Sequence, residues 1–187
     1  MKIIPFYKNE KELIRKAASN SREAQGYLYE KYAPKMLGVC RRYISDLQFA
    51  EDAMVRGFVK VFQNLSSFRH EGSFEGWIRR IMVRESIAHL RKKQFVVFDE
   101  VMFSEEASEI ADSSAAFDVE HIQRLIDGLP EGYRAVFVLY AIEGYKHQDI
   151  ADILEISEST SKSQLFKARK CLQQRLKTQN FIGYGTE

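Results

Sequence analysis

Cysteine, proline and glycine are scarce in this 187-residue chain, which has two, three and ten of them. Cys40 and Cys171 form no CxxC pair and have no Cys or His at zinc-ligand spacing, so we expect neither a disulfide framework nor a structural metal. So few glycines and prolines provide little of the turn chemistry that a many-stranded sheet needs. Long stretches rich in Leu, Ile, Ala, Glu, Lys and Arg favour helix, and we predict an all-α protein.

Long apolar runs and a strong charge of one sign are also missing. The longest apolar run, 135–142, is bounded by Arg134 and Glu143 and is far shorter than the roughly 20 residues of a membrane span. Pro5 and several charges interrupt the N-terminal residues, so we expect no signal peptide and a cytoplasmic protein. The 28 Lys and Arg nearly balance the 26 Asp and Glu, and the net charge of +2 predicts no polyanionic partner by itself.

The first half of the chain shows helical periodicity. We predict helices over 9–24 and 25–43, with a kink or restart at Pro34, a third helix after an Asp46 cap that ends near 64–67, and a fourth from a Ser73 cap to about residue 93. The expected core stripe of the third helix is Phe49, Ala53, Phe58, Val61, Phe62 and Leu65, with an exposed acidic patch at Ala50, Glu51 and Asp52. The expected core stripe of the fourth helix is Trp77, Ile81, Ile87 and Leu90.

Between 94 and 118 the helical period fades, and the segment is acidic with no Lys or Arg. We predict an acidic linker over 95–118 that joins two small helical domains, 1–94 and 119–187. In the second domain we predict helices over 119–129, 131–143, 147–154 and 158 to about 177, with a turn at 144–145.

The last two helices have the spacing of a helix-turn-helix. Its inner contacts are expected from Ile150, Ala151, Leu154, Ile156 and Leu165. The outer face of the second helix contains no acid after Glu158 and supplies Lys162, Ser163, Lys167, Arg169 and Lys170, followed by Arg175 and Lys177. A helix with charge of one sign fits a DNA major groove and its phosphates.

The fourth helix is a second basic surface, with Arg79, Arg80, Arg84, Arg91, Lys92 and Lys93 beside an aromatic-containing loop at 68–72. Charge next to aromatic rings suits single-stranded nucleic acid. Two other functions stay open. One is a regulator that binds duplex DNA by itself, and the other is a helical enzyme with a site built from His70, His89, His121 or His147, although none of these has metal or triad spacing.

Three blocks of the sequence resemble the extracytoplasmic-function (ECF) sigma factors, the smallest initiation subunits of the sigma-70 type in bacterial RNA polymerase. The first lies between Tyr27 and Phe62 and includes YLYEKY at 27–32 and AED at 50–52, and the second is FEGWIRRI at 74–81. Both are similar to the family's region 2. The third, from LPEGYR at 129–134 to TSKSQLFKAR at 160–169, is similar to region 4.

The resemblance implies a protein that binds core polymerase and reads the −35 and −10 promoter elements, with no catalysis, cofactor, metal or small-molecule substrate of its own. It implies contacts with the clamp helices and flap of the large polymerase subunit, and an anti-sigma factor as a further partner. The implied polymerase-binding residues are Glu51, Asp52, Arg56 and Lys60. The implied −10 residues are Arg69, Arg79, Arg80, Arg84, Arg91 and Lys92, and the implied −35 residues are Thr160, Lys162, Ser163, Phe166, Lys167, Arg169 and Lys170. The acidic linker would extend toward the RNA exit path.

Several positions depart from the family pattern on these surfaces. Val55-Arg56 stands where a Gln-Glu pair is usual, which predicts an altered polymerase contact. Arg84 and Ala88 replace residues that are commonly Asn or Asp, which predicts an unusual −10 preference. Glu155 and Ser159 stand where glycines are common, which predicts backbone strain in the turn.

Overall fold

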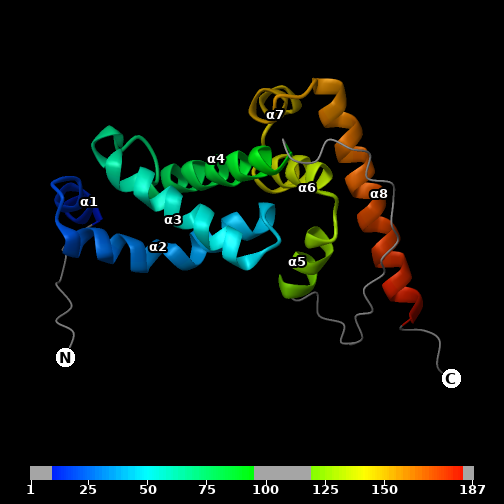
Figure 1. Ribbon diagram of the computed structural model, residues 1–187, viewed down its shortest axis with the longest axis horizontal. Coiled ribbons are helices and arrows are strands. Elements are labelled where there is room, and N and C mark those ends of the chain that lie inside the picture. The colour runs from blue at the N-terminus through cyan, green and yellow to red at the C-terminus, as the bar shows by residue number, and fades with distance from the viewer. Residues whose placement is uncertain (1–9, 95–118, 183–187) are drawn as a thin grey trace. The chain divides into compact units, whose positions relative to one another are not determined.

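The computed structural model describes residues 10–94 and 119–182, and over these residues every regular element is helical (Figure 1). The chain divides into two compact units, one up to His89 and one from Leu90 onward, and each is described by itself. The predicted linker at 95–118 lies outside the described residues.

The N-terminal unit contains α1 (Glu10–Ala18), α2 (Arg22–Tyr43), α3 (Leu47–Gln63), the 3-10 turn η1 (Leu65–Ser67) and most of α4 (Phe74–Gln94), whose last residues follow the boundary at His89. The helices α1 and α3 both pack against α2 (Figure 1). The core is built from large apolar side chains that are almost fully buried, among them Leu28, Met36 and Tyr43 of α2, Phe58 and Val61 of α3, and Ile78 and Met82 of α4. This core holds the outer faces of α3 and α4 in place.

Capping side chains set most helix starts in this unit. The Asp46 carboxylate accepts a hydrogen bond from Phe49 N at 3.1 Å, and the Ser73 hydroxyl accepts one from Gly76 N at 3.0 Å, so both predicted caps are confirmed. The expected boundary at residues 24 and 25 is wrong, because α1 ends at Ala18 and Ser21 caps α2 through Ala24 N at 3.4 Å. The helix α2 continues through Pro34 without a restart.

Parts of the predicted core stripes are wrong. Phe49 is 50% exposed, and Ala50, expected on the surface, is fully buried. The helix α3 instead turns Ala50, Ala53, Met54, Gly57, Phe58 and Val61 inward. In α4, Ile87 and Leu90 are buried as predicted, whereas Trp77 and Ile81 are only half-buried. The buried face of α4 is therefore shifted around the axis, toward Ile78 and Met82.

The C-terminal unit contains α5 (Val119–Asp127), α6 (Glu131–Phe137), the π-helical turn η2 (Val138–Ile142), α7 (His147–Leu154) and α8 (Glu158–Ile182). The helices α5, α6 and α7 all pack on α8 (Figure 1). The helix predicted over 131–143 is interrupted by η2, where Glu143 N donates to Val138 O at 3.0 Å. A π-helical turn adds one residue to the hydrogen-bonded ring and so changes the direction of the side chains that follow.

Candidate nucleic-acid interface

The helix-turn-helix forms from α7, the turn at 155–157 and α8. Ile150 and Leu165 are buried at the contact between the two helices, together with Ser161 and Ala168 of α8. Three other predicted inner residues, Ala151, Leu154 and Ile156, are only half-buried. The Ser157 hydroxyl caps α8 by accepting a hydrogen bond from Thr160 N at 3.0 Å, which fixes where the second helix begins.

The backbone of the turn adopts one left-handed conformation, at Glu155, whose φ is +56°. This is the conformation that favours glycine, so the predicted strain applies at Glu155. The prediction is wrong for Ser159, which lies within the first turn of α8 and has no positive φ.

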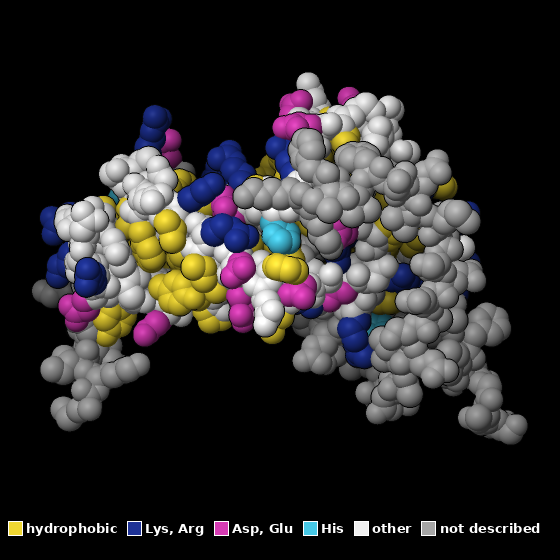
Figure 2. Space-filling model, viewed as in Figure 1, with side chains coloured by type: hydrophobic (Ala, Val, Ile, Leu, Met, Phe, Trp, Pro, Cys, Tyr) yellow, Lys and Arg dark blue, Asp and Glu magenta, His cyan; other side chains and the backbone are white. Residues whose placement is uncertain are grey.

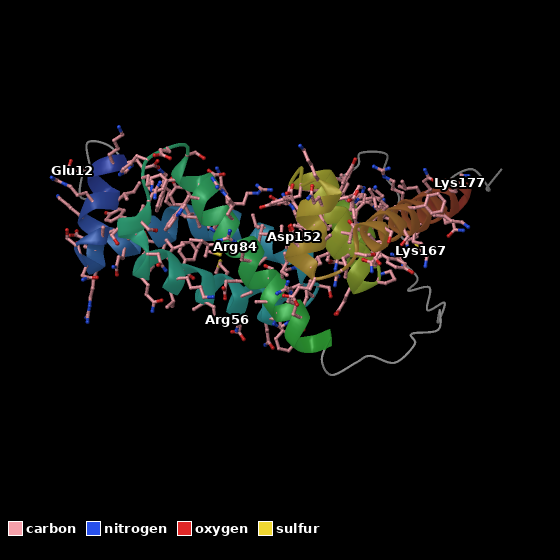
Figure 3. All side chains as sticks on the ribbon, turned by 90° about the horizontal axis from the view of Figure 1, so that it is seen from above. Glu12, Arg56, Arg84, Asp152, Lys167 and Lys177 are labelled. Atoms are coloured by element: carbon pink, nitrogen blue, oxygen red, sulfur yellow. The ribbon has the colours of Figure 1, made fainter. Side chains whose placement is uncertain are left out.

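The outer face of α8 is exposed along its first three turns, where Figure 3 labels Lys167. Six of the seven predicted −35 residues are exposed there: Lys162, Ser163, Phe166, Lys167, Arg169 and Lys170. Thr160 is half-buried. Phe166 is 69% exposed, more than any other large hydrophobic residue in the described part of the chain. The structure therefore brings these residues together on one surface.

Some polar groups of this surface already have partners within the protein. Lys162 Nζ lies 2.6 Å from Glu158 Oε1, and this ammonium group lowers the pKa of Glu158. The Thr160 hydroxyl lies 2.7 Å from Ser157 Oγ. Any ligand of Lys162 must therefore compete with a carboxylate.

Arg175 is exposed, as expected of a residue that extends the basic face, and it also makes contacts within the C-terminal unit. Its Nη2 donates to Gly128 O at 2.6 Å and its Nη1 to Leu125 O at 3.4 Å. Both carbonyl groups belong to the C-terminal end of α5, where a cation is favourable. Arg175 therefore ties α5 to α8.

The basic surface of α4 and its preceding loop is partly exposed. Arg69, Arg80 and Arg84 are exposed, and Figure 3 labels Arg84 on α4. Arg80 precedes Arg84 by four residues, so the two share one side of the helix. Arg79 and Arg91 are half-buried, and the side chain of Lys92 lies outside the described residues. Beside them the rings of Phe68, Phe74 and Trp77 pack with centroid distances of 5.1 to 5.7 Å.

The face of α3 that holds the predicted polymerase-binding residues is exposed. Glu51, Asp52, Arg56 and Lys60 all point outward, and the apolar side chains of Phe49, Val55 and Val59, each about half exposed, lie among them. Figure 2 shows hydrophobic side chains gathered on the surface of this unit. Sequence reasoning missed this mixed face, although Phe49, Asp52, Arg56 and Val59 recur at helical spacing.

Lys60 forms an ion pair that the sequence did not indicate. Its Nζ lies 2.5 Å from Glu85 Oε1, and the Glu85 side chain on α4 is only 8% exposed. Lys60 therefore provides the countercharge for a buried carboxylate and connects α3 to α4.

The four histidines form no shared site in the described part of the chain. His147 Nδ1 lies 2.9 Å from the buried Ser161 Oγ, which joins α7 to α8. Among the described residues, no three His, Cys, Asp or Glu side chains gather as metal ligands would. None of the helices described is both long enough and apolar enough for a membrane span.

Comparisons with known proteins agree with this architecture. Sigma-70 region 2 matches residues 28–96 and sigma-70 region 4 matches residues 120–172, which together cover more than half of the chain. The chain is 27% identical over 180 residues to the RNA polymerase sigma-H factor of Pseudomonas aeruginosa, covering 89% of this chain and 93% of that protein. It is also 27% identical over 180 residues to the ECF RNA polymerase sigma factor SigW of Bacillus subtilis, covering 89% and 96%.

A solved structure with a similar fold is the sigma factor RpoE of Bartonella quintana, in complex with the anti-sigma factor NepR. The TM-score is 0.52 at 22% identity, covering 81% of this chain and 96% of that chain. The two family regions, in this order on two helical units, show that the chain belongs to the sigma-70 family and is an RNA polymerase sigma factor of the ECF type.

Proposed function

We propose that this sigma factor reads the −35 element with the outer face of α8 and the −10 element with α4 and the loop before it, while the exposed face of α3 binds core polymerase. The observation that carries the proposal is the outer face of α8, where an exposed aromatic ring lies among four cations and two hydroxyl groups. The polymerase supplies the chemistry, and this chain acts in the cytoplasm without enzymatic activity of its own.

On α8, different residue types would make different kinds of contact with DNA. Lys162, Lys167, Arg169 and Lys170 can neutralise phosphates or donate to guanine, and Phe166 offers the apolar contact that a thymine methyl group prefers. Ser163 and Thr160 supply short hydroxyl groups, the type that reaches base edges or phosphate oxygens, and the Ser163 hydroxyl would give up its hydrogen bond to Thr160 O to donate to DNA. These residues lie at the start of α8, and the N-terminal part of a recognition helix is what enters the major groove.

On the N-terminal unit, exposed Arg69, Arg80 and Arg84 would follow the backbone of an unpaired strand. Arg79, Arg91 and Lys92 complete the proposed −10 set. On α3, Glu51, Asp52 and Arg56 would contact the clamp helices, with the neighbouring apolar side chains excluding water.

Lys60 is proposed to assist the polymerase contact while it remains paired with Glu85. We further infer an anti-sigma factor as a partner, because the Bartonella quintana relative is described in complex with one. The mixed apolar and charged face of α3 is where we expect it to bind.

The first test is co-migration of the purified chain with core polymerase in gel filtration, because it does not require a known promoter. A stoichiometric complex is expected. Duplex binding by the chain alone, with no polymerase complex, would instead support an autonomous DNA-binding regulator.

With the holoenzyme, promoters can be selected from random DNA and single variants compared. Lys162→Ala and Lys167→Ala should each lower affinity for the selected promoter by about 1–3 kcal/mol. Phe166→Ala should weaken the preference of the holoenzyme for one base of the −35 element. It should leave the stability of the fold unchanged, because the Phe166 side chain is mostly exposed. Normal transcription from the selected promoter by these variants would contradict the α8 assignment.

The Val55-Arg56 departure has its own test. Changing Val55→Gln and Arg56→Glu together should tighten the polymerase complex if this pair weakens docking. An unchanged affinity would show that the contact lies elsewhere on α3.

A further inference from the structure

Two tyrosines stand beside two cations of the outer α8 face. Lys167 Nζ lies 5.8 Å from the centre of the Tyr133 ring, and Arg169 Cζ lies 5.6 Å from the centre of the Tyr140 ring. Both distances fall within the range of a cation–π interaction. Tyr133 comes from α6 and Tyr140 from η2, so two different elements contact the same helix.

The two cations mark opposite edges of the exposed surface. Successive residues of an α-helix are rotated by about 100°, so Lys167 and Arg169 are separated by about 160° around the axis. The buried residues Ser161, Leu165 and Ala168 fill the far side of α8. The exposed arc between the two cations contains the remaining outer residues, Lys162, Ser163, Phe166 and Lys170.

The Tyr140 ring packs against a histidine ring of α7. It stacks on the His147 ring with a centroid distance of 4.7 Å and an interplanar angle of 23°, and His147 Nδ1 lies 2.9 Å from Ser161 Oγ on the buried side of α8. Because η2 is π-helical, its extra residue sets the direction in which Tyr140 leaves the backbone. Tyr140 is thus fixed between the inner hydrogen bond and the outer guanidinium group.

The Tyr133 ring is placed by the close approach of α6 to α8. A Cβ built on the neighbouring Gly132 would lie 3.4 Å from the Gln164 side-chain amide of α8. The backbone of α6 therefore packs closely against α8 at this point. Tyr133 itself is half-buried, so its ring is supported by the unit while the ammonium group of Lys167 remains exposed.

We propose that Tyr133 and Tyr140 are positioning residues for promoter binding, which hold Lys167 and Arg169 at the two edges of the recognition surface. Long cationic side chains lose rotamer freedom when they bind DNA, and a ring that restricts them beforehand reduces this cost. The inference rests on the proposed function, in which the outer face of α8 binds duplex DNA.

The test measures binding of the full chain to a fluorescein-labelled 24-base-pair duplex of mixed sequence, by anisotropy at low salt. Because phosphate contacts dominate binding to such DNA, an unknown promoter is not needed. Lys167→Met and Arg169→Met should weaken binding. Tyr133→Leu and Tyr140→Leu should each weaken it about two- to fivefold, while the Phe variants, which keep the ring, should bind as the parent chain does.

Double variants provide the matched control. Tyr133→Leu should have no further effect when Lys167→Met is present, and Tyr140→Leu none when Arg169→Met is present. The crossed pairs, Tyr133 with Arg169 and Tyr140 with Lys167, should multiply their effects. Equal coupling in matched and crossed pairs would overturn the proposal, because it would indicate general damage to the unit.

Two other outcomes are also decisive. Phe variants as weak as the Leu variants would show that the hydroxyl groups contact DNA and would overturn the positioning role. NMR of the free chain should show the side-chain methylene protons of Lys167 and Arg169 shifted by the ring currents, and loss of the shift in the Leu variants only. If the two Met variants bind as the parent does, the outer face of α8 is not the duplex surface, and the proposed function fails together with this inference.

Discussion

Gly57 of α3 lies in close contact with Met82 of α4. A Cβ built on Gly57 would lie 2.3 Å from Met82 Sδ and 2.9 Å from Met82 Cε, far inside ordinary van der Waals contact. Met82 is fully buried, so its thioether end must shift within the packed core to make room for an added methyl group. We therefore predict that Gly57→Ala overpacks this contact.

The magnitude follows from two opposing terms. Overpacking a buried contact costs about 1–3 kcal/mol, whereas Ala in place of Gly in a helix interior gains about 1 kcal/mol. Gly26 and Gly38 of α2 are matched controls, because they are exposed and a Cβ there would meet no atom within 4 Å. Both control substitutions should raise the free energy of unfolding by the helix-propensity gain alone. The free energy of unfolding of Gly57→Ala should be about 1–3 kcal/mol lower than that of either control.

Urea unfolding followed by tryptophan fluorescence measures this difference directly. Trp77 is the single tryptophan of the chain and belongs to α4, so its signal reports the N-terminal unit. In a Met82→Ala background, Gly57→Ala should become as favourable as the two controls. The reasoning is refuted if Gly57→Ala stabilises the parent chain as much as Gly38→Ala does.

Three further predictions concern other buried or strained groups. Lys60→Met should destabilise the N-terminal unit by about 1–3 kcal/mol in the same urea assay, because it leaves the buried Glu85 carboxylate without its ammonium partner, and adding Glu85→Gln should restore most of the loss. Glu155→Gly should raise the free energy of local opening of α7, measured by amide hydrogen exchange, by about 0.5–1 kcal/mol, because it removes a side chain from a left-handed position. Glu155→Ala should not raise it, because alanine keeps a Cβ at that position. Burial raises the pKa of Cys40 to about 11 from 9.0, so at pH 8 a thiol reagent should modify only the half-buried Cys171 of the folded chain. The neutral Cys40 thiol favours folding below pH 9, and this contribution should be lost as the pH rises toward 11; rapid labelling of both thiols at pH 8 would contradict the buried position.

The features that the sequence predicted well depend on local signals. The caps at Asp46 and Ser73 and the helix-turn-helix follow from short patterns whose physics is contained within one or two turns. The exposed position of most proposed −35 residues on α8 follows in the same way, because apart from Phe166 that face of the helix is polar or charged.

The features that were missed depend on partners distant in sequence. Phe49 was placed in the core because its helix has apolar residues on two sides, and only the packing of α3 decides between them. The π-helical turn at Val138–Ile142 lies within a continuous apolar run that is equally compatible with an uninterrupted α-helix. In the sequence Arg175 is one more cation on a basic helix. Its hydrogen bonds to Leu125 O and Gly128 O depend on the packing of α5 against α8, which the sequence pattern does not show.

In the DNA-binding mode that we propose for α8, the pair between Lys162 and Glu158 has a consequence for the salt dependence of binding. A cation already neutralised at 2.6 Å exchanges one anion for another when a phosphate arrives, so it adds less counterion release than an unpaired cation would. Affinity for arbitrary DNA should then depend less steeply on salt than the number of cations on α8 implies. We therefore expect a subunit built in this way to be held less tightly by arbitrary chromosomal DNA than a subunit with four unpaired cations on α8.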